Sequence, residues 1–376
     1  MTLVMVGAFP PPTVGLAVVN ASVLELLRRE GEYPCVINIA AYSLNRFFVV
    51  RLGRLLRVIP GIARLLIMPG LRGAALYLSV SGGWGQVYEL LFLIVARLRG
   101  MRVFLHHHSF AYLDRPNQVT RFLLRLAGRQ ATHITLSPGM AKRLLATYSD
   151  VEKIASVSNA TFLLGESTKL VSGRSHLRVL GFLGNIAEEK GIYEFLDVCA
   201  ALQAQRIPVN AKLAGPFQDT EVENTVRQQL VSLPSVEYLG PVYGADKEAF
   251  LTSIDLLLFP TRYINEAEPL TIHEAMAVGL PVIAYGRGAI PEIVSEACGR
   301  VVPVDGDFVD AAVKQIEAWL AAPQAFQAAS MAAAERFEVL RRINALRWEK
   351  LQAQIMCDAS VTAERENAAG SDSEKA

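Results

Sequence analysis

Two glutamates with a predicted helix start between them are the residues of this chain best suited to chemistry. Glu266 and Glu274 are separated by seven residues. Glu266 is expected in the loop after a buried strand that ends near Thr261, and Glu274 in the first turns of the following helix. Open α/β sheets bind ligands beyond the carboxyl ends of their strands. The two carboxylates are therefore predicted to accept hydrogen bonds from the hydroxyl groups of a ligand.

The segment between the glutamates predicts a phosphate site. Pro269, Leu270 and Thr271 should open the helix, where unpaired N–H groups and the positive end of the helix dipole attract anions, although the proline has no N–H. The helix should end at Gly279, because glycine tolerates a left-handed cap. Two carboxylates around a phosphate cradle fit a nucleotide-sugar. A solvated helix face also fits the spacing, but the small residues and the defined helix end disfavour it.

This stretch resembles the E-x7-E signature of retaining glycosyltransferases with the GT-B fold, in particular glycosyltransferase family four. The resemblance implies that Glu266 contacts the donor sugar near the reacting carbon and that Glu274 holds the ribose hydroxyls. It also implies that the backbone around Leu270 binds the diphosphate. The family usually reads E-G-F-G-L from the first glutamate, whereas this chain reads E-A-E-P-L. The two missing glycines predict a stiffer loop and an altered approach of the donor.

A second match to the family lies in the segment after the predicted strand that begins at Leu177. Gly184 and Asn185 follow this strand, and Lys190-Gly191 comes next. The family places an arginine and a lysine here, and both bind the diphosphate. Lys190 matches the lysine, whereas Asn185 stands at the arginine position and brings no charge. A dinucleotide site is disfavoured, because the strict G-x-G-x-x-G pattern is absent and no acidic residue ends the next strand.

The first half of the chain gives weaker signals for ligand contacts. Gly15 follows a proline-rich loop where the family has a glycine pair, and Leu16 stands at the second position. A plain turn from strand to helix is the alternative. The strand near residue 105 ends in three histidines, of which the resemblance implies that His107, or else His108, touches the donor sugar. A metal site is disfavoured, because neighbouring side chains on a strand point to opposite faces.

No metal or other cofactor is expected. The one D-x-D triplet of the globular part, Asp305–Asp307, binds a divalent ion in the other large glycosyltransferase fold, but here it is predicted to be a turn far from Glu266 in sequence. The leaving diphosphate would be stabilised by Lys190 and by the helix start near Leu270.

The cysteines show no metal-ligand spacing, which favours a reduced cytoplasmic setting. They are Cys35, Cys199, Cys298 and Cys357.

The length and the order of predicted elements indicate two α/β domains. A chain of 376 residues with 52% hydrophobic residues can bury two cores. We expect an acceptor-binding Rossmann-like domain over residues 1–172 and a donor-binding one over residues 173–357. The resemblance implies that they face each other across a cleft and that the last helix crosses back to the first domain. Residues 358–376 are polar and small, which predicts a disordered tail.

The segment from Arg46 to Arg72 predicts contact with a membrane surface. Residues 1–172 contain 19 lysines and arginines against 8 acidic residues, a balance of +11, and the remainder carries 18 against 28, a balance of −10. Within the segment, aliphatic and aromatic residues alternate with basic ones and acidic residues are absent, which is typical of a helix lying on anionic lipid. A solvated helix face is the alternative, and nucleic acid is disfavoured. The basic residues are Arg46, Arg51, Arg54, Arg57, Arg64 and Arg72.

Together these features predict a metal-independent retaining hexosyltransferase. It would transfer a sugar from a nucleotide-sugar to a lipid-linked or cell-surface glycan precursor, as a peripheral protein on the cytoplasmic face of the cell membrane. The sequence leaves open whether retention uses a nucleophile or same-face attack. One alternative is a protein that binds sugar nucleotides without transfer or acts as a scaffold, favoured by Asn185 and the missing glycines. Another alternative is an epimerase or phosphorylase with the same fold. The sequence predicts neither a transmembrane helix nor a signal peptide.

Overall fold

The computed structural model describes residues 2–41, 48–163 and 173–357, which form two compact units. The first unit runs to Ser158 and includes the last helix from Asn344 onward, and the second unit is Asn159–Ile343. The predicted domain boundary at residue 172, the predicted tail and Arg46 lie outside the described residues, and so does the side chain of Arg51. The cleft between the domains stays a prediction.

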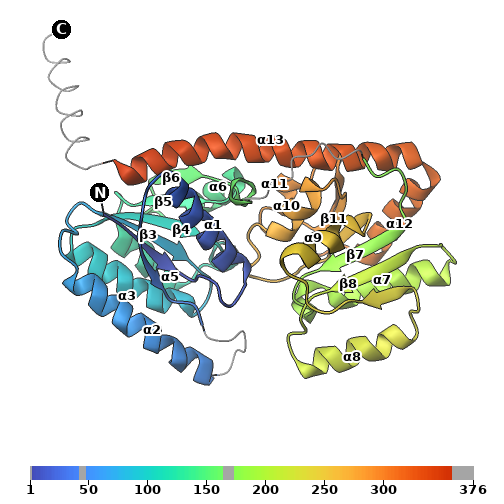
Figure 1. Cartoon of the computed structure of the whole chain (residues 1–376), viewed down its shortest axis with the longest axis horizontal. Coiled ribbons are helices and arrows are strands. Elements are labelled where there is room, and N and C mark those ends of the chain that lie inside the picture. The colour runs from blue at the N-terminus through green and yellow to red at the C-terminus, as the bar shows by residue number, and fades with distance from the viewer. Residues whose placement is uncertain (1, 42–47, 164–172, 358–376) are drawn as a thin grey trace, which may run out of the picture. The chain divides into compact units, whose positions relative to one another are not determined.

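The first unit contains a six-stranded parallel sheet with the order β2-β1-β3-β4-β5-β6 (Figure 1). All residues of β1 and β3 are buried, as expected where helices cover both faces of a parallel sheet. The strand order reverses between β1 and β3, so the carboxyl ends of these two strands form the switch point of the sheet. The strands are β1 (Leu3–Gly7), β2 (Cys35–Asn38), β3 (Ala75–Val80), β4 (Arg102–His107), β5 (Thr132–Thr135) and β6 (Lys153–Ser156).

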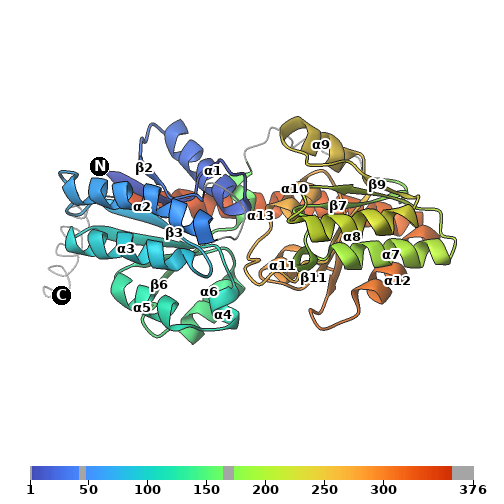
Figure 2. The ribbon, with the colours of Figure 1, turned by 90° about the horizontal axis from the view of Figure 1, so that it is seen from below.

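Three helices of the first unit, α2 (Phe48–Ile67), α3 (Gly85–Leu98) and α5 (Gln118–Ala127), pack side by side (Figure 2). Gly61 lets α2 approach its neighbours closely. A Cβ atom at this position would lie 2.6 Å from Cγ2 of Ile37 and 3.0 Å from Cζ of Phe92. The other helices of this unit are α1 (Gly15–Arg29), α4 (Ala111–Asp114) and α6 (Pro138–Thr147).

The second unit contains another six-stranded parallel sheet, with the order β12-β11-β10-β7-β8-β9. Here the strand order reverses between β7 and β10, which pair directly. The segments that follow these two strands therefore meet at the switch point of the sheet. The strands are β7 (Val179–Leu183), β8 (Asn210–Ala214), β9 (Val236–Tyr238), β10 (Leu256–Phe259), β11 (Val282–Tyr285) and β12 (Gly299–Val302).

Two hydrophobic cores stabilise the second unit. One contains buried side chains of α7 (Ile192–Ala204), α8 (Thr220–Val231) and α12 (Phe308–Ala321). The other contains side chains of α9 (Gly244–Thr252), α10 (Leu270–Ala277) and α11 (Ile290–Ile293). The last helix, α13 (Pro323–Met356), contributes Phe326 to the first core and Phe337 to the second. The sheet is thus covered on both faces, as the predicted α/β class requires.

The far end of α13 belongs to the first unit. The guanidinium of Arg102 donates hydrogen bonds to the carbonyl oxygens of Gln354, at 2.9 Å, and Ile355, at 2.8 Å. The prediction that the last helix crosses back to the first domain is therefore confirmed. Among the described residues, no helix has the length and apolar character needed to cross a bilayer.

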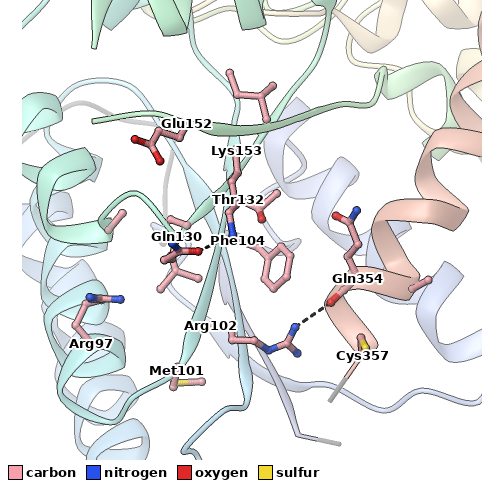
Figure 3. Close-up of a pocket in the computed structure, with 15 residues that line it drawn as sticks. Arg97, Met101, Arg102, Phe104, Gln130, Thr132, Glu152, Lys153, Gln354 and Cys357 are labelled. Carbon is pink, nitrogen blue, oxygen red and sulfur yellow. Dashed lines mark hydrogen bonds between the residues drawn. The ribbon is translucent and has the colours of Figure 1, made fainter. Parts of the chain in front are cut away.

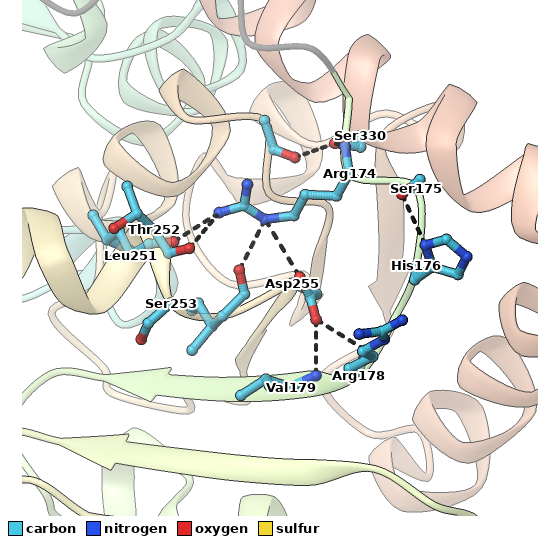
Figure 4. Close-up of polar contacts among 12 residues, drawn as sticks. Arg174, Ser175, His176, Arg178, Val179, Leu251, Thr252, Ser253, Asp255 and Ser330 are labelled. Atoms are coloured by element: carbon cyan, nitrogen blue, oxygen red, sulfur yellow. Dashed lines mark hydrogen bonds and ion pairs between the residues drawn. The ribbon is translucent and has the colours of Figure 1, made fainter.

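A partly buried arginine fixes the segment that leads into β7 (Figure 4). Nε of Arg174 donates to the carbonyl oxygen of Ile254 at 2.8 Å, and Nη2 donates to that of Leu251 at 2.9 Å. Its backbone N–H donates to Oγ of Ser330 in α13 at 2.8 Å. Because the carbonyl groups at the end of a helix have no partner within it, Arg174 caps the end of α9.

Candidate functional site

Glu266 lies at the switch point of the second sheet. Its Oε2 accepts a hydrogen bond from Nζ of Lys190 at 2.6 Å and another from Oγ1 of Thr261 at 3.2 Å. The ammonium of Lys190 also lies 4.3 Å from the centre of the Tyr263 ring. Lys190 follows β7 and Glu266 follows β10, and these strands are neighbours. The structure therefore brings two of the predicted site residues into direct contact.

A close backbone approach holds Lys190 in this position. Gly191 has φ of +84°, and a Cβ atom there would lie 2.1 Å from the carbonyl oxygen of Pro260. No side chain fits between the two segments. The lysine side chain is 23% exposed and that of Glu266 is 11% exposed. Because an ammonium has three donors, Lys190 can bind an anionic ligand while it stays next to Glu266.

The loop that carries Glu266 is supported by the segment after β11. The guanidinium of Arg287 donates to the carbonyl oxygens of Tyr263, at 3.2 Å, and Ile264, at 2.7 Å. Gly288 has φ of +59°, and a Cβ atom there would lie 2.4 Å from the carbonyl oxygen of Ala267. These contacts hold the loop in place, and its predicted stiffness stays a prediction.

Helix α10 offers an anion-binding start and a second carboxylate. Pro269 is the N-cap residue and its side chain makes no cap hydrogen bond. The N–H groups of Leu270 and Thr271 have no partner within the helix and can bind a ligand. Glu274 lies in the second turn, and its Oε1 accepts a hydrogen bond from Nζ of Lys247 at 2.5 Å. Lys247, on α9, was not predicted, because nothing in the sequence relates it to a carboxylate 27 residues away.

The glycine–asparagine pair after β7 lies at the same switch point. Gly215, at the end of β8, has φ of +144°, and a Cβ atom there would lie 1.8 Å from the carbonyl oxygen of Gly184. Asn185 is exposed. Its side chain is therefore accessible to a ligand at this edge of the sheet, and its role in donor binding stays a prediction.

The histidines at the end of β4 differ in their contacts. His107 is buried, and its Nδ1 and Nε2 lie 2.7 Å from the hydroxyl of Tyr112 and 3.0 Å from Nδ1 of His133. Burial, followed by His133 and His108, lowers the pKa of His107 well below its usual range. Nε2 of His108 has no partner among the described residues, and burial lowers its pKa to about 3. Nε2 of His108 is thus buried as well, and a contact of either histidine with the donor sugar stays a prediction.

Two further sequence features, Gly15 and the D-x-D triplet, have no ligand-binding geometry of their own in the structure. Gly15 begins α1, and nothing lies within 4 Å of a Cβ atom built on it, so packing does not require glycine there. Oδ1 of Asp307 accepts a hydrogen bond from the N–H of Asp310 at 3.0 Å and caps α12, which confirms the predicted turn. Within the described ranges, no group of three His, Cys, Asp or Glu side chains is arranged to hold a metal ion.

Glu89 lies at the switch point of the first sheet and was not predicted. It is buried on α3, and its Oε1 accepts a hydrogen bond from the N–H of Ser81, just after β3, at 3.0 Å. Its Oε2 has no partner in the part of the chain that the structure describes. Burial raises the pKa of Glu89 to about 7, against the opposing effects of Ser81 and Arg54.

Glu89 should make the stability of the protein depend on pH. The folded chain holds a proton on Glu89 up to about pH 7, whereas the unfolded chain releases it near pH 4.5. The free energy of unfolding should therefore fall as the pH rises between these values. Glu89→Gln, which stays neutral, is expected to flatten this part of the profile in urea unfolding measured from pH 5 to pH 8. The exposed Glu25→Gln serves as the control, and parallel profiles for wild type and Glu89→Gln would contradict the prediction.

A large hollow lies at the opposite edge of the first sheet (Figure 3). It has a volume of about 1050 Å³ and is bounded by the beginnings of β4, β5 and β6 and by the end of α13. It contains none of the predicted site residues. Its polar and charged lining residues include Arg97, Arg102, Gln130, Glu152, Lys153 and Gln354.

Residues 177–322 match the family model described as glycosyl transferases group 1. The putative colanic acid biosynthesis glycosyltransferase WcaL of Salmonella typhimurium is 28% identical over 126 residues, which are 32% of this chain and 31% of WcaL. The chain thus spans about a third of the length of this curated relative.

Two solved structures show that the fold extends over almost the whole chain. Sucrose-phosphate synthase from Thermosynechococcus elongatus superimposes with a TM-score of 0.69 and 16% identity, covering 94% of this chain and 98% of the synthase. Anabaena HepE in complex with UDP-glucose gives a TM-score of 0.66 and 16% identity, covering 94% of this chain and 100% of HepE. The GT-B fold that the resemblance implied is thereby confirmed, and residues 177–322, within the second unit, match glycosyl transferases group 1. Retention and membership of family four stay predictions.

Proposed function

We propose that this protein transfers a sugar from a nucleotide-sugar donor to a glycan acceptor, with the donor bound by the second unit. The observation that carries the proposal is the contact of 2.6 Å between Lys190 and Glu266 at the switch point of the sheet. A cation there can bind the diphosphate while the carboxylate accepts hydrogen bonds from the sugar. Glu274, on the adjacent helix, is available for the ribose hydroxyls. HepE, whose solved complex contains UDP-glucose, has the same fold and supports a donor of this class.

We infer that the reaction retains the anomeric configuration and needs no metal. The support is the resemblance to family four, together with two sources of positive potential near the leaving diphosphate. These are Lys190 and the uncapped N–H groups of Leu270 and Thr271. Asn185 can add a hydrogen bond at the position where the family has an arginine. Glu266, held by Lys190 and Thr261, orients the sugar.

The donor role of Glu274 can be tested by a conservative change. Glu274→Gln is expected to weaken donor binding by about tenfold to a hundredfold, because hydrogen bonds to a charged group contribute about 1.5 to 3 kcal/mol. Turnover at saturating donor should change little, since the ribose hydroxyls are bound equally in the ground and transition states. Calorimetric titration and steady-state kinetics measure the two effects. Glu248→Gln on exposed α9 is the control, and lower turnover with unchanged affinity would contradict the assignment.

We further propose that the acceptor is lipid-linked and that the protein binds the inner face of the cell membrane. WcaL is a putative glycosyltransferase of colanic acid biosynthesis, which supports a role in polysaccharide assembly. The outward side of α2 supports the membrane contact, because large apolar side chains are exposed there. Leu56 is 71% exposed, Ile59 is 61% exposed and Ile67 is 81% exposed.

Two arginines of α2 bind backbone carbonyl groups of their own unit, which was not predicted. Nε of Arg54 donates to the carbonyl oxygen of Ile39 at 2.6 Å, and Nη1 of Arg57 donates to that of Ala40 at 2.9 Å. These two side chains therefore stabilise the first unit, and exposed Arg64 also donates to the carbonyl oxygen of Val36, at 3.4 Å. The proposed lipid contact therefore depends chiefly on the apolar side chains. A test of membrane binding should leave Arg54 and Arg57 in place.

A protein that binds nucleotide-sugars without transfer is the second candidate. Asn185 at the arginine position is the observation that favours it. Incubation with radiolabelled nucleotide-sugars and a membrane extract separates the two functions. A labelled product in the lipid fraction supports transfer, whereas tight donor binding without product or free nucleotide supports the binding protein.

A further inference from the structure

Glu268 is a buried carboxylate within the loop that carries Glu266. It is 6% exposed, and its Oε2 accepts a hydrogen bond from the backbone N–H of Asn159 at 2.6 Å. Its carbonyl oxygen accepts another from Nδ2 of Asn159 at 2.9 Å, and its Oε1 lies 3.1 Å from Nε2 of His273 on α10. The loop and the first residue of the second unit are thus joined by two hydrogen bonds.

Asn159 lies at the point where the chain passes from the first unit to the second. The preceding residue, Ser158, donates its N–H to Oδ1 of Asn344 at 3.0 Å. Asn344 is the residue at which the chain returns to the first unit. Both crossing points of the chain are therefore tied by buried hydrogen bonds, and one of them is tied to the loop of Glu266.

The chemistry of Glu268 makes the connection stiff. A carboxylate bound to a backbone N–H forms a short, charge-assisted hydrogen bond. Moving Asn159 away from the loop would leave this carboxylate buried without its donor, which is costly.

We propose that Glu268 is a positioning residue that couples the crossing point at Asn159 to the placement of Glu266 in the donor site. The inference rests on the proposed function. Donor bound to the loop holds Asn159 through Glu268, and a displacement at the crossing moves Glu266 relative to the donor.

Hydrogen exchange of the peptide that contains Asn159 tests the coupling. UDP and GDP are titrated against the wild type, and the diphosphate that binds more tightly is then used. In the wild type it should slow the exchange of this peptide, and in Glu268→Leu it should have no effect there. Glu268→Gln, which keeps an acceptor oxygen, should restore the response. Equal slowing in Glu268→Leu and in the wild type would overturn the proposal.

Kinetics separate positioning from a purely structural role. Glu268→Leu should lower turnover about tenfold or more, because small misplacements of reacting groups are costly, while the affinity for the diphosphate changes less than about threefold. The control is Ser330→Ala, which removes buried hydrogen bonds elsewhere in the same unit. If Glu268→Leu only lowers the melting temperature, as Ser330→Ala should, or if Glu268→Gln fails to recover turnover, the positioning role is overturned.

A failure of the proposed function would look different. If neither the diphosphates nor a panel of nucleotide-sugars bind the wild type, the donor proposal falls. The link between Glu268 and Asn159 is then tested on the unliganded proteins. There, Glu268→Leu should speed hydrogen exchange of the peptide that contains Asn159, and Ser330→Ala should not. Unchanged exchange in Glu268→Leu would overturn the inference by itself.

Discussion

Replacement of Lys190 by alanine is expected to reduce turnover by about a hundredfold or more. Negative charge develops on the leaving diphosphate in the transition state, and removing a preorganised positive group from such a position has an effect of this size. The lysine lies 2.6 Å from Glu266, so its loss also leaves a nearly buried carboxylate without its counter-charge. Steady-state kinetics at saturating donor, with melting temperatures recorded alongside, measure both consequences.

A double variant distinguishes the two effects of losing Lys190. Lys190→Ala combined with Glu266→Gln removes the unpaired charge, so it should recover stability without recovering turnover. Lys190→Arg keeps the positive charge and should retain more activity than the alanine variant. Lys314→Ala, on the exposed surface of α12, is the control for a lysine outside the site. Near-normal turnover of Lys190→Ala would show that another group stabilises the diphosphate.

Loss of membrane binding is the second large effect that we expect. The wild type should bind vesicles that contain anionic lipid, bind neutral vesicles much less, and be only partly released by salt, which screens charges over about 8 Å. Replacing Leu56, Ile59 and Ile67 by glutamate removes the proposed apolar contact and adds repulsion. Burial of an apolar side chain of this size contributes about 1.5 to 3 kcal/mol. The triple variant should therefore bind at least a hundredfold more weakly in vesicle co-sedimentation.

The membrane experiment has an internal control. Val231 on α8 and Leu346 on α13 are also exposed, at 86% and 57%, and their replacement by glutamate should leave binding unchanged. Donor affinity of the triple variant should remain normal, because the donor is proposed to bind the second unit. Equal binding of wild type and triple variant would exclude this surface and favour a soluble acceptor.

The sequence predicted Glu266 from its place after a strand and Lys190 from the resemblance to the family, but not the contact between them. They are 76 positions apart, but strands that are neighbours at a switch point bring their following loops together. The same reasoning could not find Lys247 or Asn159, whose partners lie on other elements and at no regular spacing. Helical periodicity grouped the arginines of α2 on one face, but it cannot tell which face neighbouring elements cover. Arg54 and Arg57 consequently turned out to bind backbone carbonyl groups.

The histidine prediction shows a similar limit. His107 was selected by the resemblance, which places a histidine at the end of this strand, but its ring nitrogens contact Tyr112 and His133. His133 lies on β5, and its position beside β4 follows from the register Leu105↔His133. A single sequence does not specify the register between strands that are far apart in the chain. The contact between the rings of His107 and His133 was therefore not predictable.

The lysine–glutamate pairs give the empty donor site its own counter-ions. Lys190 pairs with Glu266 at 2.6 Å, and Lys247 pairs with Glu274 at 2.5 Å. On the proposed function, the diphosphate binds the remaining donors of Lys190 while the pair with Glu266 persists, so neither charge of the pair is left alone. When the nucleoside diphosphate leaves, both lysine–glutamate pairs are still in place. Each catalytic cycle then begins and ends with these charges compensated, which limits the electrostatic barrier to product release.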